Sequence, residues 1–272
     1  MMISEVGILL SLFNPDEQML SNCLRSISRQ TFERWHLYII LDGITISQIP
    51  LSLSSHISVD RLTLIENQRN LGLTESLNLG SDCVVEKYIA RIDDDDEWLE
   101  THLEDSINVL ERSPKVVLTG SFFYLKETNL VKKVDWASFG SVLRPFIGGS
   151  YFAHSTLVFR KKIFKDFGGY SLLQKKAQDR ELICALVHKY GMKSISYTSK
   201  YNVFICVREN SLSRTENQRL YSIIARVPFL VGRLTKSEIE LAKLLTTKFL
   251  KLGLKNKLIV ATIIALILLW RR

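Results

Sequence analysis

The stretch Tyr88-Ile89-Ala90-Arg91-Ile92-Asp93-Asp94-Asp95-Asp96-Glu97-Trp98 joins an apolar run to a run of acids. Residues 87–92 are predicted to form a buried strand, so the carboxylates follow directly at its end. Four adjacent carboxylates repel one another unless they are solvated or neutralised by a cation. An acidic run by itself is typical of a solvated loop, but its attachment to a buried strand favours a binding site.

Asp93 and Asp95 are expected on the same side of an extended chain, because side chains alternate with a period of two. Two carboxylates on one side can hold Mg²⁺ or Mn²⁺ and leave coordination positions for phosphate oxygens. Prenyl-diphosphate synthases use the pattern Asp-Asp-x-x-Asp. Here the pattern is Asp93-Asp94-x-x-Glu97 and its surroundings are not all helical, which argues against that class.

Apolar runs typical of strands alternate with stretches of helical periodicity in the first half of the chain. Strands are predicted at 6–13, 36–41, 61–65, 87–92 and 116–119, and helices at 17–29, from 74, and over 98–110. This order predicts an α/β fold with a mainly parallel sheet and helices on both faces. Because ligands bind beyond the carboxyl ends of such strands, Asn14, Asp42 and Asp93 are expected to converge on one edge.

The positive charge is concentrated near the C-terminus. Residues 215–272 hold 11 of the 36 Lys and Arg but three of the 28 Asp and Glu, which leaves 25 of each sign in the rest of the chain. A nucleic-acid-binding domain would carry its basic surface on the domain itself, so no nucleic-acid partner is expected. A neutral body with a basic tail is typical of a protein that meets an anionic membrane surface.

The tail also contains a helical, amphipathic stretch over 236–252 and an uncharged run over 258–270. As a helix, the uncharged run would be about 20 Å long, which is short of the roughly 30 Å hydrocarbon core of a bilayer. A helix lying in the membrane interface is therefore favoured over a membrane crossing. The alternative is a helix that packs on the domain or on a second copy of the chain.

The four cysteines are far apart and form no Cys-x-x-Cys pair, which predicts free thiols. The first 13 residues lack a basic start and are predicted to form a strand instead of a signal peptide. Together with the basic tail, these features predict a cytoplasmic protein that is peripheral on the inner face of the cytoplasmic membrane.

Several segments in order make residues 3–215 resemble the family 2 glycosyltransferases, which have the Rossmann-like GT-A fold and invert the transferred sugar. The matching segments are Ser11-Leu12-Phe13-Asn14-Pro15, Asp42-Gly43, Asn70 with Gly72, Leu73 and Asn78, Asp93-x-Asp95, His154-Ser155 through Tyr170, and Ala177-Gln178-Asp179-Arg180-Glu181-Leu182. Each segment is weak alone, but their order is specific. A sugar-phosphate nucleotidylyltransferase would need an early glycine-rich phosphate loop, and residues 6–25 contain none.

The resemblance implies roles around a nucleotide-sugar donor. Asp42 would accept a hydrogen bond from the imide of a uracil or thymine base, with Asn14 and Phe13 lining the same pocket. The alternative for Asp42 is a turn residue. Asn70, which lies within a matching segment, and Arg91, in the predicted strand that leads to Asp93, are further candidates for donor binding.

The resemblance also implies a metal site and a base. Asp95 would ligate Mn²⁺ or Mg²⁺ against the diphosphate, with Asp93 bound directly or through water. Asp179 would deprotonate the acceptor hydroxyl for in-line attack. The alternative for Asp179 is a carboxylate that merely favours the start of a helix.

Two positions depart from the family pattern. Arg208 stands where many relatives carry a metal-binding His, and a guanidinium cannot ligate a cation, so it is expected to clamp the diphosphate. Gln178 stands where an acid often precedes the base.

The sequence is therefore interpreted as a metal-dependent inverting glycosyltransferase domain at 1–215 with a C-terminal helical extension at 216–272. The expected donor is a UDP- or dTDP-sugar, and the expected acceptor is a glycan or a lipid-linked glycan in surface polysaccharide synthesis, such as lipopolysaccharide. Residues in 128–149 are expected to set specificity, and two chains could pair through the C-terminal helices. The alternative is a non-catalytic relative that acts as a membrane-bound scaffold, for which Arg208 is the main support.

Overall fold

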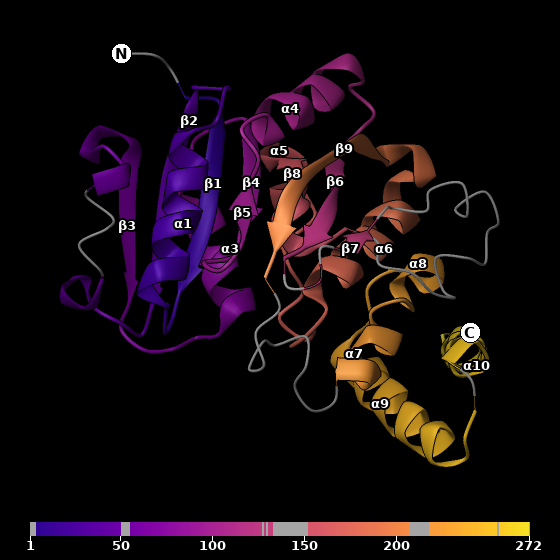
Figure 1. Ribbon diagram of the computed structural model, residues 1–272. Helices are drawn as coiled ribbons and strands as arrows, with labels where there is room; N and C mark the ends of the chain where they lie inside the picture. The colour runs from indigo at the N-terminus through magenta and orange to yellow at the C-terminus, as the bar shows by residue number, and fades with distance from the viewer. Residues whose placement is uncertain are drawn as a thin grey trace. The chain divides into compact units, whose positions relative to one another are not determined.

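A computed structural model describes residues 4–49, 55–126, 128, 130–132, 152–206, 218–254 and 256–271 (Figure 1). The chain divides into two compact units, which are considered separately. The first comprises Met1–Lys133, Phe152–Gly169 and Ile195–Val207, and the second comprises Val134–Tyr151, Tyr170–Ser194 and Arg208–Arg272. By packing, the loop and helix around residues 170–194 therefore group with the C-terminal helices. The predicted boundary near residue 215 stays a prediction.

The first unit contains a nine-stranded sheet in its described residues. The strands are β1 (Val6–Leu12), β2 (Trp35–Asp42), β3 (Leu62–Asn67), β4 (Tyr88–Ile92), β5 (Glu97–Trp98), β6 (Leu118–Leu125), β7 (Leu130–Lys132), β8 (Val158–Arg160) and β9 (Ile195–Ile205). The helices of this unit are α1 (Glu17–Ser28), α3 (Leu73–Cys83), α4 (His102–Arg112) and α5 (Lys161–Asp166), with short 3₁₀ turns η1 (Ile46–Gln48), η2 (Val59–Arg61) and η5 (His154–Thr156).

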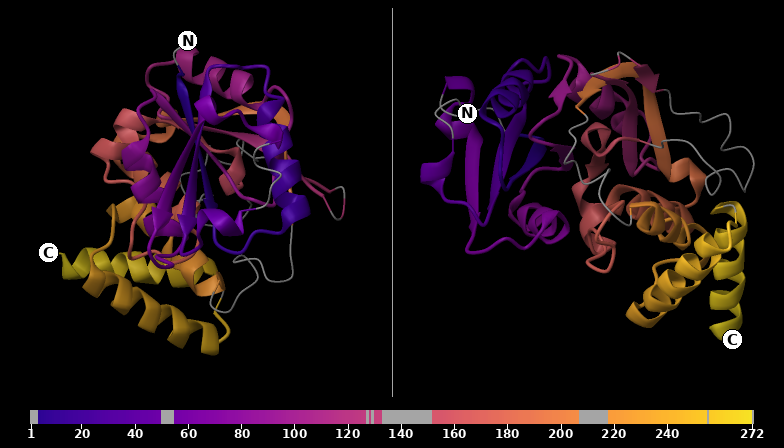
Figure 2. Two further views of the ribbon diagram at one scale, coloured as in Figure 1. Left: turned by 90° about the vertical axis from the view of Figure 1, so that its left-hand side faces the viewer. Right: turned by 60° about the horizontal axis from the view of Figure 1, so that its bottom comes forward.

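The strands follow the order β3-β2-β1-β4-β8-β6-β9-β5, with β7 beside β6. Strands β1 to β4 are parallel, as the alternation of strands and helices predicts. Beyond β4 the sheet is mixed, because β8 runs antiparallel between β4 and β6, and β9 then pairs parallel with β6. The α/β class is confirmed, and the left-hand view of Figure 2 shows the parallel strands β1 to β4 with their helices on either side.

Both faces of the sheet are covered by apolar helix faces. On one side, Leu24 and Ile27 of α1 and Leu103 and Leu110 of α4 pack with every second residue of β1, such as Ile8, in one buried cluster. On the other side, Gly80 of α3 lies directly against Leu9 of β1 and Ile40 of β2. A strand buried on both faces explains why residues 6–12 are apolar except for Ser11.

The predicted helix over 98–110 begins later in the structure. Trp98 lies in the short strand β5, opposite Val203 of β9, and its indole Nε1 donates to the carbonyl of Ser155 at 2.7 Å. The helix itself, α4, starts at His102. The apolar spacing of Trp98 and Leu103 therefore reflects burial of both residues on one side of the sheet, not a continuous helix.

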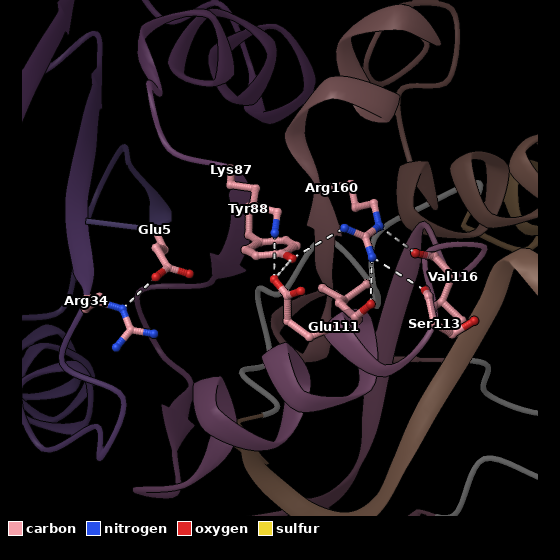
Figure 3. A network of polar contacts seen from close by, with 9 residues as sticks. Glu5, Arg34, Lys87, Tyr88, Glu111, Ser113, Val116 and Arg160 are labelled. Atoms are coloured by element: carbon pink, nitrogen blue, oxygen red, sulfur yellow. Dashed lines mark hydrogen bonds and ion pairs between the residues drawn. The ribbon is translucent and has the colours of Figure 1, made fainter. Parts of the chain in front are cut away.

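A polar network fastens α4 to the sheet at the amino-terminal end of β4 (Figure 3). Glu111 accepts from Lys87 Nζ at 2.6 Å and from the hydroxyl of Tyr88. Arg160 donates to that hydroxyl at 3.3 Å and to the carbonyls of Leu110 at 2.6 Å and Val116 at 2.9 Å. These contacts satisfy carbonyls at the helix end and fix α4 on the edge of the sheet opposite the acidic run.

The second unit is helical in its described residues. It contains α6 (Gln178–Tyr190), the turn η6 (Met192–Ser194), α7 (Gln218–Ile224), α8 (Pro228–Val231), α9 (Lys236–Lys251) and α10 (Asn256–Trp270). Helix α9 begins with a capping box between Thr235 and Glu238. Among the described helices, none combines the length and the apolar character that a membrane crossing requires.

The uncharged tail run folds back onto its own unit. Helix α10 packs against α7, α8 and α9 and buries Ile259, Val260, Ile263, Ile264 and Ile267. After it, Arg271 forms an ion pair with Glu238 of α9 at 2.5 Å and donates to the carbonyl of Val231. One face of the run is therefore a packing face, which is the alternative that the sequence left open.

Candidate active site at the carboxyl edge of the sheet

Four parallel strands end at the same edge of the first unit, as predicted. Strand β1 ends before Phe13 and Asn14, β2 ends at Asp42, β3 ends at Asn67, and β4 ends before Asp93. The pairing register places Leu12 beside Leu41 and Asp42 beside Asn67, so these ends are level. Such an edge is where α/β proteins bind ligands.

Asp42 is a buried acceptor at this edge, with 2% of its surface exposed. Its Oδ1 accepts from Asn67 Nδ2 at 3.1 Å and from the Leu71 amide at 2.8 Å, and its Oδ2 accepts from the Gly72 amide at 3.0 Å. An ionised carboxylate has about four acceptor positions, so roughly one remains for a ligand donor. Asp42 therefore organises the loop that follows β3.

Asn70 belongs to the loop that Asp42 holds. Its Oδ1 accepts from the Gly72 amide at 2.8 Å, two residues further on. The loop closes on Gly43, which has φ +80°, and an added Cβ there would lie 2.5 Å from the Asn70 nitrogen. A glycine is needed at this position both for its backbone conformation and for the close approach of the loop.

Phe13 and Asn14 form the loop between β1 and α1. Both side chains are exposed, Phe13 by 56%, which is unusual for a phenylalanine beside a buried strand. The loop is fixed from behind, because Asp16 caps α1 by accepting from the Met19 amide at 2.9 Å. The structure thus presents an aromatic ring at the strand edge.

The acidic run forms a tight turn, not an extended strand. Asp94 and Asp95 are turn residues, and the Asp96 amide donates to the Asp93 carbonyl at 3.2 Å. Asp93, Asp95 and Asp96 each offer a carboxylate oxygen, and the three oxygens lie within 4.8 Å of one another. Asp93 and Asp95 come together as predicted, but through the turn and not through a period of two.

Asp96 is the member of this group that the sequence pattern does not single out. It is 3% exposed and accepts from the hydroxyl of Ser155 and from the Cys206 amide at 2.9 Å. Burial raises the pKa of its carboxyl, and the charges of Asp93 and Asp95 raise it further. Asp96 thereby ties the acidic turn to η5 and to the end of β9, contacts that are remote in sequence.

Arg91 places a buried positive charge under the turn. Its side chain is 1% exposed and its guanidinium donates to both oxygens of Asp93. The same charge, after burial, lowers the pKa of His154, which is therefore neutral near pH 7. Arg91 binds a protein carboxylate in this structure, and its predicted contact with a donor stays a prediction.

The acidic turn fits a hard divalent cation by its donor set. Carboxylate oxygens are the ligands that Mg²⁺ and Mn²⁺ prefer, and three within 4.8 Å can converge on one ion. Asp93 shares its oxygens with Arg91. Asp93 would therefore meet a cation through water or after Arg91 shifts, and the role of Asp95 as a ligand stays a prediction.

Asp179 lies in the second unit, in the first turn of α6, and is partly exposed. The residue before the helix, Ala177, has φ +55° and ψ +38°. Gln178 and Glu181 on either side of Asp179 are buried. Arg208 and the predicted specificity segment 128–149, apart from residues 128 and 130–132, lie outside the described residues.

Comparison with known proteins assigns the chain to a family. The sequence profile described as "Glycosyl transferase family 2" matches residues 8–180, which is more than half of the chain and includes β1 to β4, the acidic turn and Asp179. The chain belongs to glycosyl transferase family 2.

Curated relatives of the chain are glycosyltransferases. An uncharacterized glycosyltransferase of Methanocaldococcus jannaschii is 26% identical over 80% of this chain and 76% of its own length. The amylovoran biosynthesis glycosyltransferase AmsE of Erwinia amylovora is 29% identical over 42% of this chain, which spans 44% of it. An Escherichia coli UDP-Gal:alpha-D-GlcNAc-diphosphoundecaprenol beta-1,3-galactosyltransferase is 26% identical over 60% of this chain and 61% of its length.

Among solved structures, Staphylococcus aureus TarS 1–349 in complex with UDP-GlcNAc matches with a TM-score of 0.62 and 16% identity. The match covers 89% of this chain and 71% of that one. At this identity the match establishes the fold, which is GT-A and Rossmann-like as the sequence predicts.

Proposed function

We propose that this glycosyltransferase moves a sugar from a UDP- or dTDP-sugar to a hydroxyl of a glycan or lipid-linked acceptor, with inversion at the anomeric carbon. The observation that carries the proposal is the gathering of Asp93, Asp95 and Asp96 at the edge where β1 and β2 also end. Two relatives named for amylovoran biosynthesis and for a diphosphoundecaprenol-linked galactosyl transfer support surface polysaccharide synthesis as the setting.

In this proposal the first unit binds the donor. The remaining acceptor position of Asp42 receives the base imide, and the exposed ring of Phe13 stacks on the base beside Asn14. Asp95, with Asp93 and Asp96, would hold Mn²⁺ or Mg²⁺. The chemistry that such a cation supplies when bound is Lewis-acid neutralisation of charge on a departing diphosphate. Arg208 would add a positive charge to the same diphosphate.

Asp179 is proposed as the general base of the reaction. It would take the proton from the acceptor hydroxyl while that oxygen forms a bond to the anomeric carbon. The bond between the anomeric carbon and the diphosphate oxygen breaks at the same time, and its electron pair leaves with the nucleoside diphosphate. A single displacement of this kind inverts the anomeric configuration and needs no covalent intermediate on the protein.

The test of donor binding is the thermal stability of the purified protein with UDP-, dTDP-, GDP- and CMP-sugars, each with and without Mn²⁺. A ligand at about 100 times its dissociation constant adds roughly 2.7 kcal/mol to the free energy of unfolding. We expect a metal-dependent shift with a uridine or thymidine sugar. Folded protein that responds to none of these sugars would favour the non-catalytic scaffold instead.

The stereochemical proposal has its own test. The anomeric configuration of the product is read by NMR from the coupling of the transferred sugar's anomeric proton. The proposal requires a configuration opposite to that of the donor, and a retained configuration would contradict a single displacement with Asp179 as base.

We also propose that the tail meets an anionic membrane, on the inner face of the cytoplasmic membrane. Helix α10 also exposes Leu258, Leu266, Leu268, Leu269 and Trp270. The described acids of α9 are paired, Glu238 with Arg271 and Glu240 with Lys243 at 2.8 Å, whereas Lys248 and Lys251 are exposed. An exposed apolar face beside lysines is typical of an interfacial helix.

Co-sedimentation with vesicles tests the membrane proposal. We expect binding to vesicles that contain phosphatidylglycerol, weakening with salt, and a loss of binding in the double variant Leu269→Ser with Trp270→Ser. Leu172→Ser, at an equally exposed leucine of the same unit outside the tail, is the control and should bind normally. Absence of lipid binding together with a concentration-dependent dimer mass would assign the face to chain pairing.

A further inference from the structure

The backbone immediately before the proposed base adopts a conformation that is unfavourable for its residue. Ala177 is the one non-glycine residue with positive φ in the described part of the chain. A residue that has a Cβ rarely adopts this backbone conformation, and it does so where the surrounding structure holds it in place. The next residues, Gln178 and Asp179, start α6. The contacts that hold this turn therefore also set the direction of the Asp179 side chain.

The loop that leads to Ala177 is tied to α7. Gln174 is 1% exposed, and its side-chain Nε2 donates to the carbonyl of Lys176 at 2.7 Å and to the carbonyl of Tyr221 at 2.9 Å. One buried amide thus joins the residue before Ala177 to the C-terminal helices. A buried hydrogen bond of this kind is costly to leave unmade, so it fixes the loop.

The first turn of α6 is tied to the same helices from its other side. Arg180 donates to the hydroxyl of Ser222 in α7. Glu181, which is 4% exposed, accepts from Arg233 Nε at 3.2 Å, and Arg233 lies between α8 and α9. Burial raises the pKa of Glu181 while the Arg233 charge lowers it, as expected for a carboxylate that depends on its partner. Asp179 stands between these two sets of ties.

We propose that α7 and the α8–α9 connection are positioning elements for Asp179, with Gln174, Ser222 and Arg233 as the residues that act. The C-terminal helices would then serve the reaction itself as well as any membrane contact. This inference rests on the proposed role of Asp179 as base. Its physical reason is that a base works only within hydrogen-bond reach of the proton it removes, and an error of about 1 Å can cost roughly 100-fold in rate.

The inference predicts a separation between binding and turnover. Asp42 and the acidic turn belong to the first unit, whereas these ties lie within the second. Loss of one of these hydrogen bonds or of the ion pair should therefore lower kcat and leave the affinity for the nucleotide unchanged. A residue with a merely structural role would lower kcat and UDP binding together, because less of the protein would be folded.

The experiment uses the full chain with UDP and Mn²⁺ as the binding probe and UDP release from UDP-GlcNAc and UDP-galactose as the turnover probe. Arg233→Gln and Ser222→Ala are expected to lower kcat by roughly 10- to 100-fold with the dissociation constant of UDP within about twofold of wild type. Arg233→Lys keeps the charge and should recover part of kcat. Ser222→Ala removes a single hydroxyl, so at least one variant stays folded.

Lys248→Gln is the matched control, because it removes a cation from an exposed position of the same helix, α9. It should keep wild-type kcat. Asp179→Asn in the same assay separates the two levels of the proposal. If Asp179→Asn retains turnover, the assignment of the base fails. If Asp179→Asn is inactive while Arg233→Gln and Ser222→Ala turn over normally, or if both variants lose UDP binding with kcat, the positioning role is overturned.

Discussion

The guanidinium of Arg91 donates hydrogen bonds to both carboxylate oxygens of Asp93 in the acidic turn. The Arg91 side chain is 1% exposed and the Asp93 side chain is 38% exposed. A buried positive charge at this point offsets the repulsion among neighbouring aspartates, which a turn of adjacent acids would otherwise suffer. The pair explains how this chain tolerates four consecutive aspartates at the end of a buried strand.

Replacing this arginine tests its structural contribution. Arg91→Met leaves Asp93 without its partner and should lower the free energy of unfolding by about 2–3 kcal/mol, below the range for fully buried pairs because Asp93 is half exposed. Urea denaturation measures the change. Lys162→Met, which breaks the exposed pair with Asp166, should cost less than about 1 kcal/mol. Equal effects in the two variants would contradict the role of Arg91.

Gly43 provides a second prediction, on the loop that Asp42 organises. Gly43→Ala combines an unfavourable φ of +80° with a Cβ 2.5 Å from the Asn70 nitrogen. Gly191→Ala shares the unfavourable φ, +79°, but no described atom lies within 4 Å of its Cβ. The control should lose about 1–2 kcal/mol of stability. Gly43→Ala should lose more of the free energy of unfolding, measured by urea denaturation, and should also weaken UDP binding. Equal losses of stability in the two variants would exclude displacement of the loop.

His102 predicts a pH dependence of stability. It is fully buried, stacks on Trp98 with ring centroids 4.5 Å apart, and neither ring nitrogen has a hydrogen-bond partner among the described residues. Burial lowers its pKa to about 3. Between about pH 6.5 and 3 the unfolded chain binds a proton here that the native state excludes. Stability from this group is therefore complete above pH 6.5 and falls as the pH drops, by up to about 1.4 kcal/mol per pH unit.

The variant His102→Phe keeps the ring against Trp98 and removes the titration. The difference in unfolding free energy between variant and wild type, measured at pH 8 and at pH 5, should grow in favour of the variant at the lower pH. A difference that is constant with pH would mean that His102 takes up a proton in the native state as readily as in the unfolded chain.

The order of strands in the first unit and the convergence at its edge follow from local patterns. Largely apolar runs such as 6–12 predict strands buried on both faces, and parallel pairing brings Asp42 and Asp93 to one edge. The position of Trp98 could not be predicted, because its strand depends on Val203 and on the carbonyl of Ser155. Apolar spacing cannot distinguish that burial from a helix.

Long-range contacts also explain what the sequence left open in the acidic run and in the tail. Asp96 joins the carboxylate group through Ser155 and Cys206, which are 59 and 110 residues away. Likewise, the apolar run of α10 has one packed and one exposed face, and composition alone cannot tell these faces apart. One face of α10 therefore packs on α7, α8 and α9, and the exposed residues are those that the membrane proposal concerns.

Calorimetric titration of Mn²⁺ into the UDP-saturated protein tests most directly whether the acidic turn is a metal-dependent donor site. Asp95→Asn should weaken Mn²⁺ binding by at least roughly 100-fold, since a charged ligand typically contributes about 3 kcal/mol or more. Asp94→Asn changes the same charge in the same turn at a residue outside the group of three, and it should bind Mn²⁺ as wild type does. Equal Mn²⁺ affinity in wild type and Asp95→Asn would contradict a metal site at the acidic turn.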